Sequence, residues 1–305
     1  MKHVTLGNSH LVSSQLVYGC MRTVGDGSQR ERKKGKDAIA AAIEAGYNHF
    51  DHADIYGQGE CETLFGEFLR ENPGTRESLI ITSKCGIRFR DTPNPGDPGR
   101  YDFSAEHITK SVEGSLTRLD IDRLDILLLH RPDYLFDAIE VAEALVKLKE
   151  QGKVSHFGLS NFSPSQVSLL WQHLGHDLLL HQVEINIHNI DAFANGVLDQ
   201  CQQLRISPQA WAPVAGVVRT PLNDQFTEDD YRRIQQELER QSDNYGLEDW
   251  VVVLSWLLKH PANILPVIGS IQPTRIQSAV DATALDYSRE DWYRLLEARN
   301  GQPVP

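Results

Sequence analysis

Short apolar runs that alternate with amphipathic stretches are the feature that most restricts the possible folds of this chain of 305 residues. Each run is nearly continuous in apolar residues, which is typical of parallel strands that are buried on both faces. Eight runs follow one another: "LVYG" near Leu16, "NHFDHA" near Phe50, "LIITSKC" near Ile81, "LDILLLH" near Leu127, "VSHFGLS" near Phe157, "LLLHQVEIN" near Gln182, "PQAWAP" near Trp211 and "ILPVIGS" near Val267. A parallel sheet covered by helices is therefore expected.

The segments between the runs carry helix signals. "KDAIAAAIEAG" spaces its apolar residues at a helical period and stops at Gly46. In "SAEHITKSVEGSLTRL" Ser104 is a plausible cap, and in "SPSQVSLLWQHLG" Ser163 caps a helix with Pro164 at its first position. "AIEVAEALVKLKEQGK" and "EDWVVVLSWLLKHP" are two further helices.

Eight strand and helix units on one chain favour a closed (β/α)8 TIM barrel, as a single domain over residues 1–305. A doubly wound open sheet is the alternative, but neither "YGCMRTVGDG" nor "YGQGECE" matches the G-x-G-x-x-G turn that such a sheet would normally carry. "HVTLGNSHLVSSQL" predicts an N-terminal β-hairpin at the bottom of the barrel. The extra loops expected on the C-terminal face are "RFRDTPNPGDPGRYD", Arg88 to Asp102, and "VAGVVRTPLNDQFTED".

The composition narrows the choice of partners and compartment. A formal net charge of −12 makes nucleic acid and anionic membranes poor partners. The N-terminus has no apolar signal segment, and the longest apolar run, Trp250 to Leu258, is too short to span a bilayer. The four cysteines form no C-x-x-C pair, so we expect free thiols in the cytoplasm.

Polar side chains stand at the ends of three neighbouring predicted strands. Asp51 ends "NHFD", Lys84 ends "IITSK" and His130 ends "DILLLH", while Tyr56 lies in the loop just after Asp51. Because parallel strands of a barrel all end on the same face, these four side chains are expected to meet at one rim. A purely structural ion pair between Asp51 and Lys84 is the alternative, and the tyrosine and histidine argue against it.

These residue types suit the reduction of a carbonyl group. A buried Lys84 needs a counter-ion, which Asp51 provides. An ammonium group next to a phenol favours the phenolate, so the pKa of Tyr56 is expected below its ordinary value of about 10. Tyr56 would then act as a general acid, and His130 would orient the oxygen on which negative charge develops. No side chain carries hydride, so a nicotinamide cofactor is implied.

The sequence resembles the aldo-keto reductase family from "LVYGCMRT" to "PVIGSIQPTRI". The resemblance is strongest in "DHADIYG", "TSKCG", "LLLHRPD", "GKVSHFGLSNFSP", "QVEIN" and "WAPVAG". It implies a (β/α)8 barrel that binds extended NADPH without a Rossmann turn and reduces aldehydes or ketones. The catalytic tetrad of the family corresponds here to Asp51, Tyr56, Lys84 and His130.

The resemblance also implies cofactor contacts. Ser160, Asn161 and Gln182 would hold the carboxamide, and Trp211 would stack on the nicotinamide ring. It also implies contacts from Asp51 and from Met21, at a position that often carries a large pocket residue. Ala212 and Val214 would lie near the pyrophosphate. The residues implied near the adenosine 2′-phosphate are Gly269, Ser270 and Arg275.

Two departures from the family pattern bear on the cofactor. Many relatives have a lysine or arginine in place of Gly269, and the Glu-Asn pair that often holds adenine is replaced by Ser278 and Ala279. Arg275 still favours NADPH over NADH.

Other functions fit less well. The sequence has no H-E-x-x-H motif and no G-x-S-x-G elbow, so we expect neither a metal site nor a serine hydrolase. The alternative function is a cofactor-binding auxiliary or redox-sensing subunit with little turnover; the chain shows no added docking segment, which favours the enzyme. The expected partner is a small-molecule carbonyl substrate, and the expected state is a monomer or weak homo-oligomer.

Overall fold

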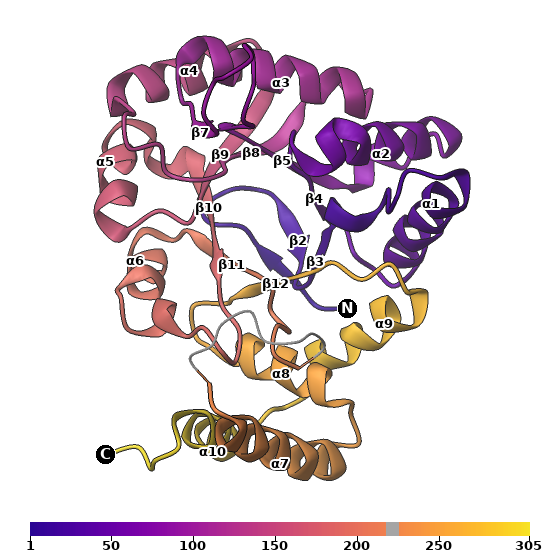
Figure 1. Cartoon of the computed structure of the whole chain (residues 1–305), viewed down its shortest axis with the longest axis vertical. Helices are drawn as coiled ribbons and strands as arrows, with labels where there is room; N and C mark the ends of the chain where they lie inside the picture. Colours follow the sequence, from indigo (N-terminus) through magenta and orange to yellow (C-terminus); the bar gives the residue numbers. More distant parts are fainter. Residues whose placement is uncertain (218–225) are drawn as a thin grey trace.

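Eight parallel strands close into a barrel in the computed structural model, which describes residues 1–217 and 226–305 (Figure 1). The strands are β3 (Val17–Gly19), β4 (His49–Asp51), β5 (Ile80–Cys85), β8 (Leu124–Leu129), β9 (Val154–Ser160), β10 (Leu178–Glu184), β11 (Ser207–Trp211) and β12 (Leu265–Ile268). Each strand pairs with the next in this order, and β12 pairs with β3 to close the ring. The predicted barrel is confirmed. Seven strands fall within their apolar runs, and β11 begins one residue before its run, at Ser207.

Helices surround the barrel (Figure 1). They are α1 (Gln29–Glu44), α2 (Glu60–Glu71), α3 (Ala105–Leu119), α4 (Ala138–Glu150), α5 (Pro164–Leu174), α6 (Val197–Leu204), α7 (Glu228–Tyr245), α8 (Asp249–Leu258), α9 (Pro273–Ser278) and α10 (Arg289–Asn300). Two predicted starts are correct: the side chain of Ser104 accepts a hydrogen bond from the backbone N–H of His107, and Ser163 forms a reciprocal capping box with Gln166. Among the described residues no helix is long and apolar enough to cross a membrane.

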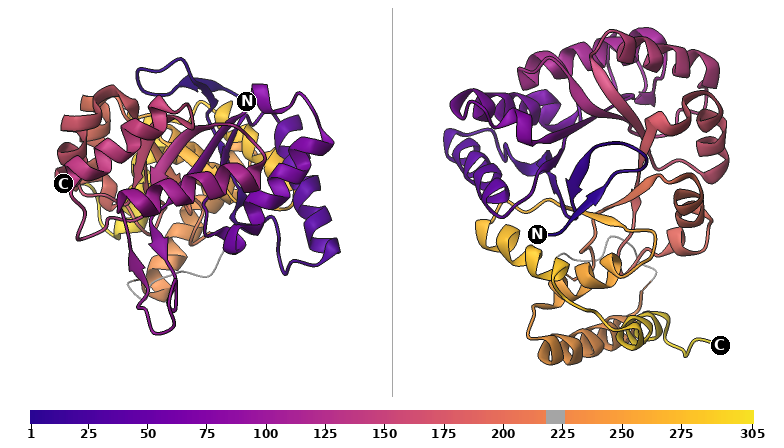
Figure 2. Two further views of the ribbon diagram at one scale, coloured as in Figure 1. Left: turned by 90° about the horizontal axis from the view of Figure 1, so that it is seen from above. Right: turned by 180° about the vertical axis from the view of Figure 1, so that it is seen from behind.

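The two ends of the barrel differ. At one end β1 (His3–Thr5) and β2 (Val12–Ser14) form the expected antiparallel hairpin, and Leu6 between them has no exposed surface and packs against apolar residues of the strands. At the opposite end a second hairpin, β6 (Ile87–Arg88) and β7 (Arg100–Tyr101), projects outward (Figure 2). With one end closed by the N-terminal hairpin, the carboxyl ends of the strands form the accessible face.

The two predicted long loops compare differently with the structure. Arg88 to Asp102 was expected to be a loop, but its ends pair as β6 and β7, so only the tip is irregular. Part of the second loop, residues 218–225, lies outside the described residues, and α7 begins directly after it at Glu228.

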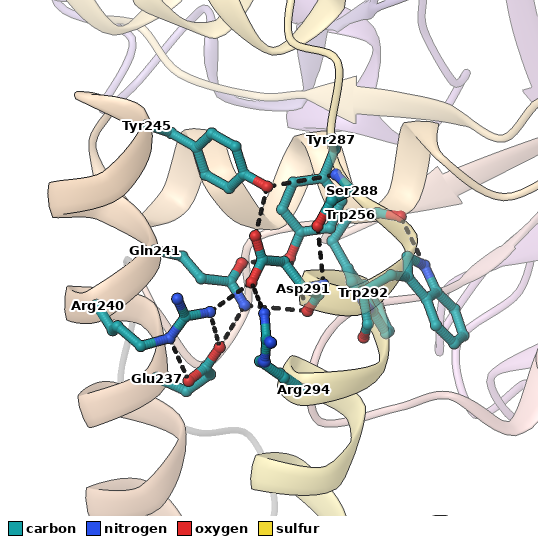
Figure 3. Close-up of polar contacts among 10 residues, drawn as sticks. All are labelled: Glu237, Arg240, Gln241, Tyr245, Trp256, Tyr287, Ser288, Asp291, Trp292 and Arg294. Atoms are coloured by element: carbon teal, nitrogen blue, oxygen red, sulfur yellow. Dashed lines mark hydrogen bonds and ion pairs between the residues drawn. The ribbon is translucent and has the colours of Figure 1, made fainter.

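A polar network joins α7 to α10 on the outside of the barrel (Figure 3). The Asp291 carboxylate accepts hydrogen bonds of 2.5 Å from Arg240 and from the hydroxyl of Tyr245. The side-chain nitrogen of Gln241 donates to the backbone oxygen of Asp291. The side-chain oxygen of Gln241 accepts a hydrogen bond from the hydroxyl of Tyr287. Charged partners strengthen such bonds, so this network fixes the two helices against each other.

Candidate active site

The four predicted catalytic residues lie together at the carboxyl ends of β4, β5 and β8, which are neighbours in the barrel. Asp51 is the last residue of β4, and Lys84 is the penultimate residue of β5. His130 was expected to end a strand, but it follows the last residue of β8. Tyr56 opens the short 3-10 helix η2 (Tyr56–Gly59) that follows β4.

Lys84 is the centre of the site. Its side chain has no exposed surface, and its Nζ donates to Asp51 Oδ2 at 2.6 Å, to the backbone oxygen of His52 at 2.9 Å and to the Tyr56 hydroxyl at 3.1 Å. An ammonium group has three hydrogens, so each has an acceptor. Burial alone would lower the pKa of Lys84, but the attraction of Asp51 and the Tyr56 hydroxyl outweighs it and the pKa is raised. Lys84 therefore remains positively charged.

The pKa of Tyr56 corrects one expectation. The sequence predicted a value below the ordinary one, but burial of the phenol raises the pKa of Tyr56, and the opposing effect of Lys84 only reduces this shift. The reason is that the apolar surroundings disfavour the phenolate more strongly than one ammonium, itself paired with Asp51, favours it. Tyr56 is consequently a protonated phenol at neutral pH.

His130 lies beside Tyr56 as a neutral imidazole. The two ring centroids are 5.9 Å apart and the ring planes are nearly perpendicular. Burial, followed by the positive charges of Lys84 and Arg131, lowers the pKa of His130 to about 2. Its Nδ1 atom is buried and has no hydrogen-bond partner within the described parts of the chain.

The loop from Asp51 to Tyr56 is held along β5. The backbone N–H of His52 donates to the oxygen of Thr82, and that of Asp54 donates to the oxygen of Lys84. His52 packs its ring against Phe65, and burial, followed by the charge of Lys84, lowers the pKa of His52 to about 3. These contacts fix the direction in which Tyr56 leaves the strand.

The residues expected to hold the nicotinamide ring adjoin the tetrad. The Gln182 amide donates to Asp51 Oδ1 at 3.0 Å. Asn161, at a left-handed φ of 62°, donates to Ser160 Oγ at 2.8 Å and accepts the indole N–H of Trp211 at 2.9 Å. The structure therefore gathers an amide pair, a hydroxyl and a half-buried indole beside Lys84 and Tyr56. This set of groups fits a nicotinamide ring with its carboxamide.

The remaining expected contacts spread along the same face. Met21 is half exposed in the 3-10 helix η1 (Cys20–Arg22), and Ala212, at a left-handed φ of 50°, begins the turn after β11 that contains Val214. Ser270 accepts the hydroxyl of Tyr18 at its backbone oxygen, and Arg275 is exposed on α9.

Sequence reasoning missed three arginines near the site. Arg22 donates to the backbone oxygen of Gly269 at 3.1 Å, which brings a positive charge next to Gly269. The guanidinium carbon of Arg131 lies 5.6 Å from the ring centroid of Trp211. Behind the tetrad, Arg118 forms an ion pair of 2.7 Å with the fully buried Glu62. For Arg131, the signal in the sequence was its place directly after His130 in "LLLHRPD".

No group of three or more His, Cys, Asp or Glu side chains in residues 1–217 and 226–305 is arranged to hold a metal ion. All four cysteines are buried and free.

Comparisons with known proteins place the chain in a family. The aldo/keto reductase family model matches residues 15–300. An oxidoreductase of Escherichia coli (strain K12) is 41% identical over 269 residues, with 88% of each chain covered. A 6-dehydroglucose reductase of Agrobacterium fabrum (strain C58) is 35% identical over 305 residues, covering 100% of both chains. An aldo-keto reductase of Bacillus halodurans, solved in its holo form, shares the fold with a TM-score of 0.84 at 23% identity, covering 100% of this chain and 98% of that one. The family model covers most of the chain and the relatives named here are oxidoreductases, so the chain belongs to the aldo/keto reductase family.

Proposed function

We propose that the protein reduces an aldehyde or ketone to an alcohol with hydride from NADPH, and that Tyr56 is the general acid. The observation that carries this proposal is the position of the Lys84 ammonium, which donates to Asp51 and to the Tyr56 hydroxyl at the same time. A phenol held in this way is a proton donor whose conjugate base is stabilised by the adjacent cation.

The roles of the chain's own residues follow from the geometry. The bound cofactor supplies the hydride that reaches the carbonyl carbon. Tyr56 donates its proton to the carbonyl oxygen, and Lys84 stabilises the phenolate until solvent returns a proton. Asp51 keeps Lys84 charged and in place. The neutral imidazole of His130 donates a hydrogen bond that orients the carbonyl oxygen.

Ser160, Asn161, Gln182 and Trp211 are proposed to hold the nicotinamide end of the cofactor beside this tetrad. Arg22 supplies a cation at Gly269, directly after β12, and Arg275 supplies another on α9, the next helix along the chain. A guanidinium recognises a phosphate through paired N–H donors, which supports NADPH over NADH. Equilibrium binding of both cofactors to the wild type and to Arg275→Met tests this preference directly.

The test of the function is turnover on a panel of aldehydes and ketones, followed through the absorbance of NADPH. The panel includes 6-dehydroglucose, because a relative with 35% identity carries that name. Tyr56→Phe should lower kcat by at least about a hundredfold while NADPH binding is retained, because only the proton donor is removed. Tyr293→Phe, on the exposed side of α10, is the matched control and should leave kcat unchanged. Tight NADPH binding without turnover on any carbonyl compound would favour the auxiliary-subunit function instead.

A further inference from the structure

Arg131 reaches across the mouth of the barrel. It directly follows His130 at the end of β8, and its guanidinium carbon lies 5.6 Å from the ring centroid of Trp211, the last residue of β11. The strands β9 and β10 lie between these two in the barrel. The indole N–H of Trp211 donates to Asn161, whose amide donates to the backbone oxygen of His130 at 3.4 Å. Arg131 therefore lies among residues that surround the reaction site.

The charge of Arg131 has no counter-ion in the described structure. Within residues 1–217 and 226–305 the guanidinium makes the contact with the Trp211 ring but no hydrogen bond or ion pair. By contrast, two arginines of the β6–β7 hairpin are paired: Arg88 with Asp102 at 2.6 Å, and Arg100 with Asp97 at 3.6 Å. Arg131 is partly buried, but its guanidinium nitrogens are open to solvent, so a ligand can replace water as their acceptor.

Arg131 also acts on the site electrostatically. Burial and the charge of Lys84 lower the pKa of His130 most, and the positive charge of Arg131 lowers it further. Arg131 therefore lies close enough to His130 for its charge to act on the site, and a charge-assisted hydrogen bond in a partly buried site is stronger than in water. A net charge of −12 on the whole chain would otherwise repel an anion.

We propose that Arg131 is the substrate-binding residue that selects carbonyl compounds carrying a carboxylate group. The proposal rests on the carbonyl reductase function and names its substrate class. The planar guanidinium presents paired N–H donors that match the two oxygens of a carboxylate, and the contact with Trp211 limits its orientation. The carbonyl end of such a substrate lies at Tyr56 and His130, and the carboxylate lies on the Arg131 side of the mouth.

A simpler role is that Arg131 only supports the Trp211 ring by a cation–π contact. If this were its whole role, the protein would show no preference among substrates by charge. Replacing Arg131 would then disturb the Trp211 ring equally for charged and uncharged substrates. The two roles are separated by a pair of substrates that differ in charge and little else.

The substrates are 4-formylbenzoate and 4-formylbenzamide, which share ring, aldehyde and shape. For the wild type with NADPH, kcat/KM should be at least about tenfold higher for the carboxylate, mainly through KM. Arg131→Met keeps the aliphatic part of the side chain without its charge. It should abolish this preference by lowering kcat/KM at least about tenfold for the carboxylate and much less for the amide. Arg131→Lys should restore part of the preference, because the charge returns without the paired donors.

Binding gives a second measurement that does not depend on turnover. Benzoate and benzamide are titrated calorimetrically into the NADPH-bound wild type and the NADPH-bound Arg131→Met variant. Benzoate should bind at least about tenfold more weakly to the variant, and benzamide equally to both. Preference for benzoate without reduction of either aldehyde would overturn the proposed function but support the role of Arg131. Turnover of both aldehydes without a charge preference, or equal losses for both in Arg131→Met, would overturn the role of Arg131 and leave the function intact.

Discussion

At the scale of single residues, the site is organised by one buried ammonium group. Lys84 satisfies its three hydrogens with Asp51, His52 and Tyr56, and this arrangement explains why a lysine is tolerated without any exposed surface. The same burial raises the pKa of Tyr56 rather than lowering it. The tetrad could be predicted from the sequence because parallel strands end on one face, but the direction of that shift depends on how closely the phenol is packed.

A second titratable residue, Asp54, lies in the same loop as Tyr56. Burial, followed by the negative charge of Glu62 on α2, raises the pKa of Asp54 to about 7, while Ser111 and Arg118 on α3 oppose the shift. The pKa of Asp54 is about 7 in the folded state and about 4 in the unfolded state. Between about pH 4 and about pH 7 the folded state therefore binds a proton that the unfolded state has released. The free energy of unfolding therefore falls as pH rises from about 4 to about 7 because of this group.

Asp54→Asn should remove this part of the pH dependence. The variant should gain stability relative to the wild type between pH 5 and pH 8, on the order of 2 kcal/mol, because the amide stays neutral. Urea unfolding at both pH values measures the change, with Asp243→Asn on the exposed part of α7 as the control. An identical offset from the wild type at both pH values would show that Asp54 does not titrate in this range.

At the scale of elements, α2, α3 and β5 are joined by a buried ion pair. Arg118 of α3 donates to Glu62 of α2 at 2.8 Å, and the hydroxyl of Ser83, next to Lys84, donates to the same carboxylate at 2.5 Å. Two glycines leave room for the arginine: a Cβ atom at Gly59 would lie 2.7 Å from its Cδ, and one at Gly114 would lie 2.9 Å from its Nη1. The position of the Arg118 side chain therefore depends on two residues that have no side chain themselves.

Breaking this pair from one side should be costly. Arg118→Met leaves the Glu62 carboxylate buried with its positive partner gone, and should lower the free energy of unfolding by about 3 kcal/mol. The double variant Arg118→Met with Glu62→Gln should recover at least about half of this loss, because no charge is left unpaired. Arg70→Met, which removes an exposed pair with Asp120, should cost less than about 1 kcal/mol. Strictly additive losses in the double variant would mean that the pair is not coupled.

The elements also show where the sequence was informative. The barrel strands were predictable because strands buried on both faces are nearly continuous in apolar residues, as Ile126 to Leu129 in β8 are. The helix α7 was hard to predict because only Ile234, Leu238 and Gln241 of its 18 residues are buried, so its apolar stripe is narrow. The contact between Arg131 and Trp211 was not predictable, since it joins residues 80 positions apart across two intervening strands.

At the scale of the whole molecule, the reaction face and the α7–α10 network serve different purposes. The tetrad lies at the ends of β4, β5 and β8, whereas α7 and α10 lie together outside the barrel wall (Figure 1). The stability that the network provides can therefore be changed without touching the chemistry. Asp291 is the residue on which most of the network's hydrogen bonds converge (Figure 3).

Asp291→Asn should separate stability from activity. Although burial opposes it, hydrogen bonds from Tyr245, Arg240 and Arg294 hold the pKa of Asp291 below its ordinary value. This carboxylate therefore stabilises the fold above the unfolded pKa of about 4, and the stabilisation is lost as pH falls below that value. The variant should lose about 2 kcal/mol of unfolding free energy at pH 7 and clearly less at pH 3.

Asp286→Asn is the control: the side chain of Asp286 is fully exposed, so this variant should change the unfolding free energy at neither pH. Because the network does not contact the tetrad, kcat of the folded Asp291 variant should equal that of the wild type, and a matching fall in kcat would show that α7 and α10 are coupled to the reaction face after all.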